Sequence, residues 1–265
     1  MRIVSARSGW SWLVRGFALF RKSPPMWLFL ALMYFVAQIL FAQFRYLGPA
    51  VFMVLLPGFV MSFMFVCAVI EHGGMPRPSL LVSGFRSGLS TLMLLGVLQL
   101  LAIAAVLGLA SLADAGALAG SLLYGQEPPE DAINDGSASR ALVIMALAGT
   151  PILMAFWFAP LLAAWSRMGA VQAVFYSFFA VWRNWRAFLV YGGAIFLAGV
   201  LFLLATTVVT MLAQRKMEAV QMLTLAFTLL TFPTLVASLY ASYRDIFPEN
   251  AVPAEPPPPS DAGSP

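Results

Sequence analysis

The chain has 265 residues, of which 61% are hydrophobic and only 10% are charged, and its formal net charge at pH 7 is +4. Because a soluble domain carries charge on about a quarter of its residues, this composition excludes an aqueous fold and leaves no segment polar enough for a separate soluble catalytic domain. The single cysteine, Cys67, excludes an intrachain disulfide.

The N-terminal segment from Gly9 to Lys22 has the pattern of an amphipathic helix. Large apolar side chains recur on one helical face, and basic residues occupy the other faces. The apolar set is Trp10, Leu13, Phe17 and Phe20, and the basic set is Arg7, Arg15 and Lys22. This pattern is typical of a helix that lies in the plane of the lipid headgroups.

Six uncharged apolar stretches follow, and each is close to the roughly 20 residues that a helix needs to cross a bilayer core. They cover residues 26–44, 46–70, 89–113, 141–166, 187–213 and 219–243. A secretory signal peptide is the competing interpretation of the first stretch. The patterned segment ahead of that stretch is longer than the short basic region of a signal peptide and favours a retained span. The sequence therefore predicts an all-α integral membrane protein with six transmembrane helices.

Two features recur along the chain and suggest an internal repeat. The even-numbered stretches contain Pro57, Pro160 and Pro233, each followed by small or hydroxylated residues, and prolines inside a helix are expected to kink it. The amphipathic pattern returns after the fourth stretch and, more weakly, at residues 78–88. The second copy contains Val171, Phe175, Phe178, Trp182 and Trp185, with Arg183 and Arg186 among them.

These features predict three tandem helical hairpins, each with an amphipathic lead-in segment, a straight span and a proline-kinked span. The alternative is six unrelated spans with the aromatic and basic edges and the occasional kinks that such proteins commonly have.

Two segments lie outside this pattern. The loop at residues 114–140 is acidic and rich in glycine, and a short helix is expected near Leu118 to Tyr124. The C-terminal segment at residues 248–265 is rich in proline and is predicted to be a disordered cytoplasmic tail.

The basic residues predict the orientation of the spans. Of the 15 Lys and Arg residues, eleven fall on the side of the two termini. Only Arg45, Arg140, Arg215 and Lys216 fall on the other side. The positive-inside rule then places both termini in the cytoplasm. At the end of the sixth span, Arg244 and Asp245 could pair with a lead-in helix, although an ordinary charged stop at the interface is the alternative.

Few residues could relay protons, bind a metal ion or catalyse a reaction. No ionisable residue lies between the ends of the spans, and the sole histidine, His72, adjoins Glu71 at a span end, where an interfacial pair is expected rather than a proton relay. One cysteine, one histidine and scattered acids supply neither a closed metal shell nor a catalytic triad. We expect no enzyme activity, no cofactor and no metal.

The polar residues inside the spans allow two interpretations. Thr224, Thr228 and Thr231 form one stripe on the sixth span. Ordinary helix packing, with hydroxyls bonded to carbonyl oxygens, is the first interpretation. The second is a polar lining for a solute path, with Gln99 facing it.

Several motifs resemble a family of uncharacterised bacterial six-span inner-membrane proteins. They are Gly9–Arg21, Phe158–Leu161 with Trp165, Arg183–Phe188 and Tyr240–Phe247. The resemblance implies an integral membrane protein and no established activity. The Arg-Asn lead-in to the fifth span and the Tyr-Arg-Asp ending are also faintly similar to the membrane domains of some glycerophosphodiester phosphodiesterases, whose hydrolase domain is absent here.

Three functions are compatible with these features. The first is a non-enzymatic inner-membrane protein that serves membrane organisation or a protein assembly and binds anionic headgroups through its basic lead-in segments. The residues expected to carry this binding are Arg15, Arg21, Lys22, Arg183 and Arg186. The second is a transporter or facilitator of a small or lipidic solute, with the kinked spans lining its path. The third is a membrane subunit of a separately encoded enzyme. Membrane lipids are the expected partners, a protein partner of unknown identity is left open, and no nucleic acid is expected.

Overall fold

The computed structural model describes residues 1–45, 47–86, 88–125, 127, 132, 134–212 and 217–250, and its regular structure in these ranges is entirely helical. Six helical units there are long and apolar enough to cross a membrane, which confirms the predicted fold class. They are α2 (Pro24–Ala42), α3 (Leu47–Glu71), α4 (Leu89–Asp114), the α7 and α8 pair (Ser137–Phe156 and Ala159–Trp165), α10 (Trp185–Leu212) and α11 (Met217–Ile246).

The three lead-in segments are all helical and precede α2, α4 and α10. They are α1 (Ser8–Lys22), the 3-10 helix η1 (Pro78–Arg86) and α9 (Ala170–Arg183). The lead-in segment with the weakest amphipathic pattern, at residues 78–88, is thus the one that forms a 3-10 helix rather than an α-helix. Helix α1 ends at Lys22 because Ser23 precedes Pro24, and a residue before proline is disfavoured in the α conformation.

The three hairpins are α2–α3, α4–α7/α8 and α10–α11, and the lead-in helices join them in a closed ring. Helix η1 packs on α3, α9 packs on α7 and α8, and α1 packs on α11. Each lead-in helix therefore covers the kinked span of the preceding hairpin, and the first lead-in closes the ring on the last hairpin. This cyclic pattern confirms the predicted hairpins with their lead-in helices.

Two glycines make the closest of these contacts in equivalent ways. A Cβ on Gly16 of α1 would lie 2.5 Å from the Thr234 carbonyl oxygen and 2.7 Å from the Ser238 nitrogen. A Cβ on Gly84 of η1 would lie 2.1 Å from the Gly58 carbonyl oxygen and 2.5 Å from the Ser62 nitrogen. In both cases the contacted residues follow the kink proline by one and five positions, so the two lead-in helices dock on their prolines in the same register.

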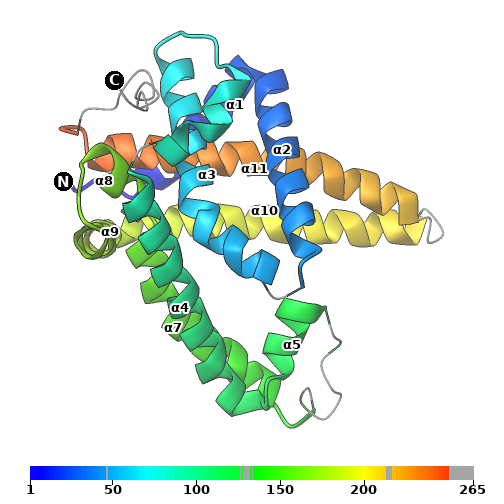
Figure 1. The fold of residues 1–265 in the computed structure, drawn as a ribbon. Helices are drawn as coiled ribbons and strands as arrows, with labels where there is room; N and C mark the ends of the chain where they lie inside the picture. Colours follow the sequence, from blue (N-terminus) through cyan, green and yellow to red (C-terminus); the bar gives the residue numbers. More distant parts are fainter. Residues whose placement is uncertain are drawn as a thin grey trace.

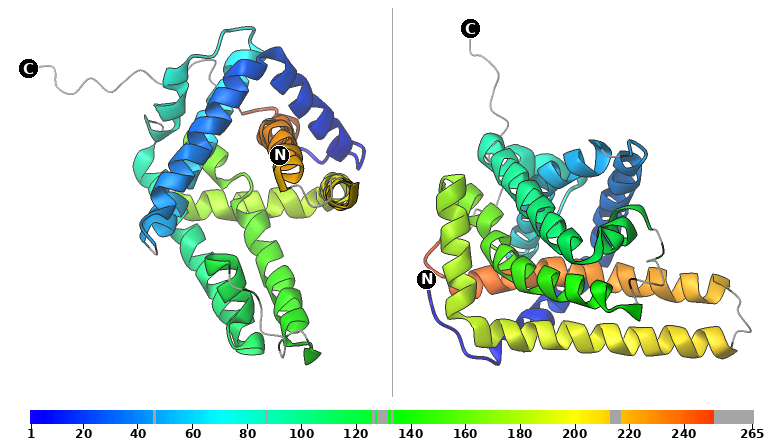
Figure 2. Two further views of the ribbon diagram at one scale, coloured as in Figure 1. Left: turned by 90° about the vertical axis from the view of Figure 1, so that its right-hand side faces the viewer. Right: turned by 90° about the horizontal axis from the view of Figure 1, so that it is seen from below.

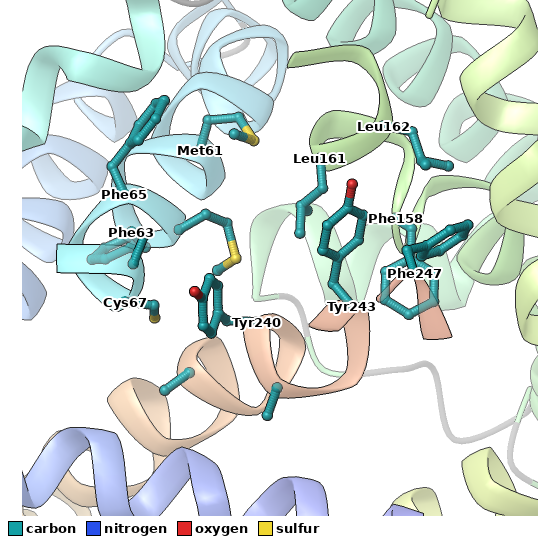
Figure 3. Close-up of a cluster of buried hydrophobic side chains, with 14 of the residues drawn as sticks. Met61, Phe63, Phe65, Cys67, Phe158, Leu161, Leu162, Tyr240, Tyr243 and Phe247 are labelled. Atoms are coloured by element: carbon teal, nitrogen blue, oxygen red, sulfur yellow. The ribbon is translucent and has the colours of Figure 1, made fainter. Parts of the chain in front are cut away.

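The hairpins are splayed: their ends meet on one side of the molecule and diverge on the other (Figures 1 and 2). We call the meeting point the hub, which comprises the last third of α3, α8 and the last third of α11. Figure 3 shows Tyr240 of α11 beside the α3 side chains, and Tyr243 of α11 between Leu161 and Phe158 of the α8 region. Tyr240, Tyr243 and Phe158 are almost completely buried. Both Met1 and the end of α11 lie at the hub, since the Arg2 N–H donates to the Ile246 carbonyl oxygen at 2.7 Å.

The fourth span is broken rather than kinked. Its helix stops at Phe156 and restarts at Ala159, with Pro160 in the first turn of α8. The hydroxyl of Ser177 on α9 accepts the Phe158 N–H at 2.9 Å and donates to the Met154 carbonyl oxygen at 2.9 Å. A buried hydroxyl from the next lead-in helix thus satisfies backbone groups that the break frees. Pro57 and Pro233 lie inside continuous helices, as does Pro151 of α7, which the sequence pattern did not single out.

The loop after α4 contains the expected short helix, α5 (Ala117–Tyr124). The carboxylate of Asp114 accepts the Gly116 and Leu118 N–H groups at 3.0 and 2.7 Å and so fixes the turn into α5. At the other end of the loop, the Ser137 N–H donates to Asp135 at 2.7 Å, and hydrogen bonds from Ser137 lower the pKa of that carboxyl.

The structure describes the first three residues, 248–250, of the segment predicted to be a disordered tail. Asn250 donates to the Ser166 hydroxyl at 2.8 Å and to the Tyr243 hydroxyl at 3.0 Å. The remainder of the predicted tail, residues 251–265, lies outside the described part of the chain, so its disorder stays a prediction.

Candidate functional site

The outer face of α9 exposes a ridge of large apolar side chains. Val171, Phe175 and Trp182 of α9 and Trp185, the first residue of α10, are between 53% and 75% exposed. Ala173, Ser177 and Ala180 on the opposite face of α9 are completely buried. The small residues let α9 lie close against α7, and the aromatic residues remain on the outside.

Basic residues flank this ridge and its counterpart on α1. Arg183 and Arg186 are exposed beside Trp182 and Trp185. On α1, Trp10 is 61% and Phe17 is 39% exposed, and the guanidinium of Arg21 lies 5.8 Å from the centre of the Phe17 ring. Aromatic rings with adjacent arginines are the composition that interfacial helices use at headgroup depth.

Arg15 of α1 also contacts the end of α11. Its Nη2 lies 2.9 Å from Oδ2 of Asp245 at the end of α11, and the same oxygen accepts the indole N–H of the buried Trp12 at 2.9 Å. The predicted pairing of Asp245 with a lead-in helix is therefore confirmed. One Nη of Arg15 thus closes α1 onto α11, while the predicted role of Arg15 at lipid headgroups stays a prediction.

Arg244 pairs with a transmembrane helix instead. Its Nε lies 3.4 Å from Oε2 of Glu71 at the end of α3, and the Tyr240 hydroxyl donates to the same oxygen at 2.5 Å. Glu71 is thus held by α11 rather than by its neighbour His72, whose Nδ1 lies 2.8 Å from the Ala68 carbonyl oxygen. The sequence pattern missed this contact because the partners are 169 residues apart.

Asn184, between α9 and α10, is a second residue whose role the sequence did not indicate. Its Oδ1 accepts the Val4 N–H at 2.8 Å, and its Nδ2 donates to the Ala180 and Arg2 carbonyl oxygens at 2.9 and 3.3 Å. The Asn184 side chain therefore ties the N-terminal segment to the third lead-in helix.

A cavity of about 500 Å³ lies between the first two hairpins. Its lining is apolar except for the amide of Gln99 and the indole of Trp157, and it includes two of the three kink prolines, Pro57 and Pro160. Pro233 is buried elsewhere.

The threonine stripe of α11 is not part of this cavity. Thr224 bonds to the carbonyl oxygen of Val220 in its own helix at 2.8 Å, and Thr228 and Thr231 are half-exposed away from the cavity lining. The structure therefore brings Gln99 together with the prolines but not with the threonines, which fits the packing interpretation of the stripe.

In the described part of the chain, no three His, Cys, Asp or Glu side chains lie close enough together to hold a metal ion. The geometry thus defines the chain as a multi-pass integral membrane protein whose distinctive surfaces are the lead-in helices, the charged hub contacts and the apolar cavity.

The chain is 33% identical to a protein of Burkholderia thailandensis named as a probable inner membrane protein, over 253 residues that cover 92% of each chain. It belongs to the family of that inner-membrane protein, which confirms the resemblance to an uncharacterised membrane family. No family model matches the chain. No solved structure matches it either.

Proposed function

We propose that the protein is a non-catalytic inner-membrane protein that binds anionic lipid headgroups through its lead-in helices, and so organises the membrane or an assembly within it. The exposed aromatic ridge of α9, flanked by Arg183 and Arg186, is the observation that carries this proposal. Each basic residue near an anionic surface contributes about 1 kcal/mol of attraction.

In this proposal the hub faces the cytoplasm. The lead-in helices, the N-terminal residues and the end of α11 lie at the hub, and eleven of the 15 Lys and Arg residues fall on that side of the predicted topology. The excess of basic residues on the cytoplasmic side of membrane proteins supports this orientation, as does the anionic surface of that leaflet.

Charge reversal on the lead-in helices should weaken binding of anionic lipid. Arg21→Glu/Arg183→Glu removes two cations from the exposed faces, so we expect the affinity for dioleoyl phosphatidylglycerol to fall by at least about thirtyfold. Native mass spectrometry of the detergent-solubilised protein, titrated with this lipid, measures the change. The matched control is Arg140→Glu, an exposed arginine near the opposite end of the bundle. Equal affinities in the double variant and the control would contradict the proposal.

The cavity supports a second candidate function, the facilitated movement of a lipidic solute. Its two kink prolines and the single amide of Gln99 resemble the interrupted helices that frame membrane binding sites. Gln99→Leu should slow the scrambling of a fluorescent phospholipid in proteoliposomes by about fivefold, since it removes one hydrogen-bonding group. Thr228→Leu, outside the cavity, should leave the rate unchanged. Identical rates in wild type and Gln99→Leu would remove this candidate.

A further inference from the structure

A small basic notch opens beside the contact of α1 with α11. It has a volume of about 190 Å³, below the roughly 300 Å³ of the smallest typical ligand pockets. Its charged lining consists of Arg15 and Lys22 from α1, Arg244 from α11 and Glu71 from the end of α3. The notch thus joins residues from three helices that lie far apart in the sequence.

The charges of the notch are only partly compensated. Arg15 uses one Nη for Asp245, and Arg244 uses its Nε for Glu71. Since a guanidinium has five N–H donors, each arginine keeps further donors for another acceptor. Lys22 is exposed and has no hydrogen-bond or ion-pair partner among the residues that the structure describes. The three cations Arg15, Lys22 and Arg244 are therefore compensated by only two carboxylates, those of Glu71 and Asp245. The net charge of the group is positive.

The position of the notch matches headgroup depth. Lys22 is the last residue of the interfacial helix α1, and α2 enters the membrane directly after it. Glu71 and Arg244 mark the ends of two further spans. A group bound here would lie at the border of the hydrocarbon core.

We propose that this notch binds a phosphate group, supplied by an anionic phospholipid or by a soluble phosphate. Arginine forks and a lysine ammonium are the side chains that recognise phosphate, through paired hydrogen bonds and through point charge respectively. A volume of about 190 Å³ suits a group of this size rather than a large organic ligand. This inference deepens the proposed function, on which it rests for the membrane setting.

The Glu71 carboxylate competes with a bound phosphate for Arg244. Its carboxylate holds Arg244 at 3.4 Å and places a negative charge on the notch wall. In Glu71→Gln the amide oxygen still accepts the Tyr240 hydroxyl, but the negative charge is gone and Arg244 is released toward the notch. The proposal therefore predicts tighter phosphate binding in this variant, a gain that misfolding cannot imitate.

The experiment compares Lys22→Gln and Glu71→Gln with Arg140→Gln as the matched control. Arg140 carries the same charge and is also exposed, but it lies near the opposite end of the bundle and does not line the notch. The full-length protein in detergent is titrated with dioleoyl phosphatidylglycerol, with dioleoylglycerol and with inorganic phosphate, by native mass spectrometry for the lipids and by calorimetry for the ion. We expect Lys22→Gln to weaken the first phosphatidylglycerol adduct by about fivefold and Glu71→Gln to strengthen it by a similar factor.

The three titrants separate the sources of the phosphate. If the variants change only phosphatidylglycerol binding, the notch takes a lipid headgroup; if inorganic phosphate follows the same order, it takes a soluble phosphate. If neither variant changes the binding of either, or if dioleoylglycerol responds equally, the inference is overturned. Failure of the proposed function looks different: Arg21→Glu/Arg183→Glu would then bind lipid normally while Lys22→Gln and Glu71→Gln still shift the discrete adduct.

Discussion

Gly16→Ala and Gly84→Ala should each lower the free energy of unfolding by about 3 kcal/mol, the upper range for overpacking a tight contact. The new Cβ would lie within 2.5 Å of backbone atoms of the kinked helix, and backbone cannot move aside as a flexible side chain can. The lead-in helix must therefore withdraw, which opens the ring at α1–α11 or at η1–α3. For a protein of this size, the loss corresponds to a fall in melting temperature of roughly 6–12 °C.

Gly108→Ala is the matched control for this prediction. Gly108 lies within α4, and a Cβ there would have no neighbour within 4 Å. Since alanine favours a helix over glycine by about 1 kcal/mol, this variant should melt at the same temperature or slightly higher. Differential scanning fluorimetry in one detergent compares all three variants with wild type. Equal melting temperatures for Gly16→Ala and Gly108→Ala would show that the lead-in helices are dispensable for closure.

The architecture was largely predictable from the sequence because a bilayer imposes simple rules. A span needs a long uncharged stretch, and all six were visible for that reason. The kink prolines and the aromatic and basic lead-in segments recur at corresponding places, so the three hairpins were visible as well. The ring was not predictable. The ring depends on the contacts of Gly16 and Gly84 with the backbone of other helices. The sequence around a glycine in an apolar helix does not indicate which helix it will contact.

The candidate site was only partly predictable, because periodicity identifies an apolar face without saying what covers it. In α9 the predicted apolar face is the exposed one, and the buried face consists of small residues such as Ala173 and Ala180. In α1 the basic residues divide in the same way: Arg21 faces outward, whereas Arg15 bonds to Asp245. Inside a membrane both surfaces are apolar, so hydrophobicity cannot distinguish a lipid contact from a helix contact.

The second large effect is expected at Asp245, whose carboxylate joins α1 to the end of α11. Asp245→Ala should cost about 3 kcal/mol, because it leaves the indole N–H of the buried Trp12 without an acceptor and also removes the ion pair with Arg15. Arg15 is 45% and Asp245 is 25% exposed, so the ion pair itself should contribute at most about 1 kcal/mol.

Variants at Trp12, Arg15 and Asp245 can separate the contribution of the indole hydrogen bond from that of the ion pair. In Asp245→Asn the amide oxygen still accepts the Trp12 N–H, so this variant should lose only about 1 kcal/mol, close to Arg15→Gln. In a Trp12→Phe background, which has no N–H to satisfy, Asp245→Ala should cost much less than it does in wild type. Denaturant or thermal unfolding of the single variants and of Trp12→Phe/Asp245→Ala measures these differences. Should Asp245→Asn prove as damaging as Asp245→Ala, the ion pair would dominate instead, and ring closure at α1–α11 would depend on charge and weaken with added salt.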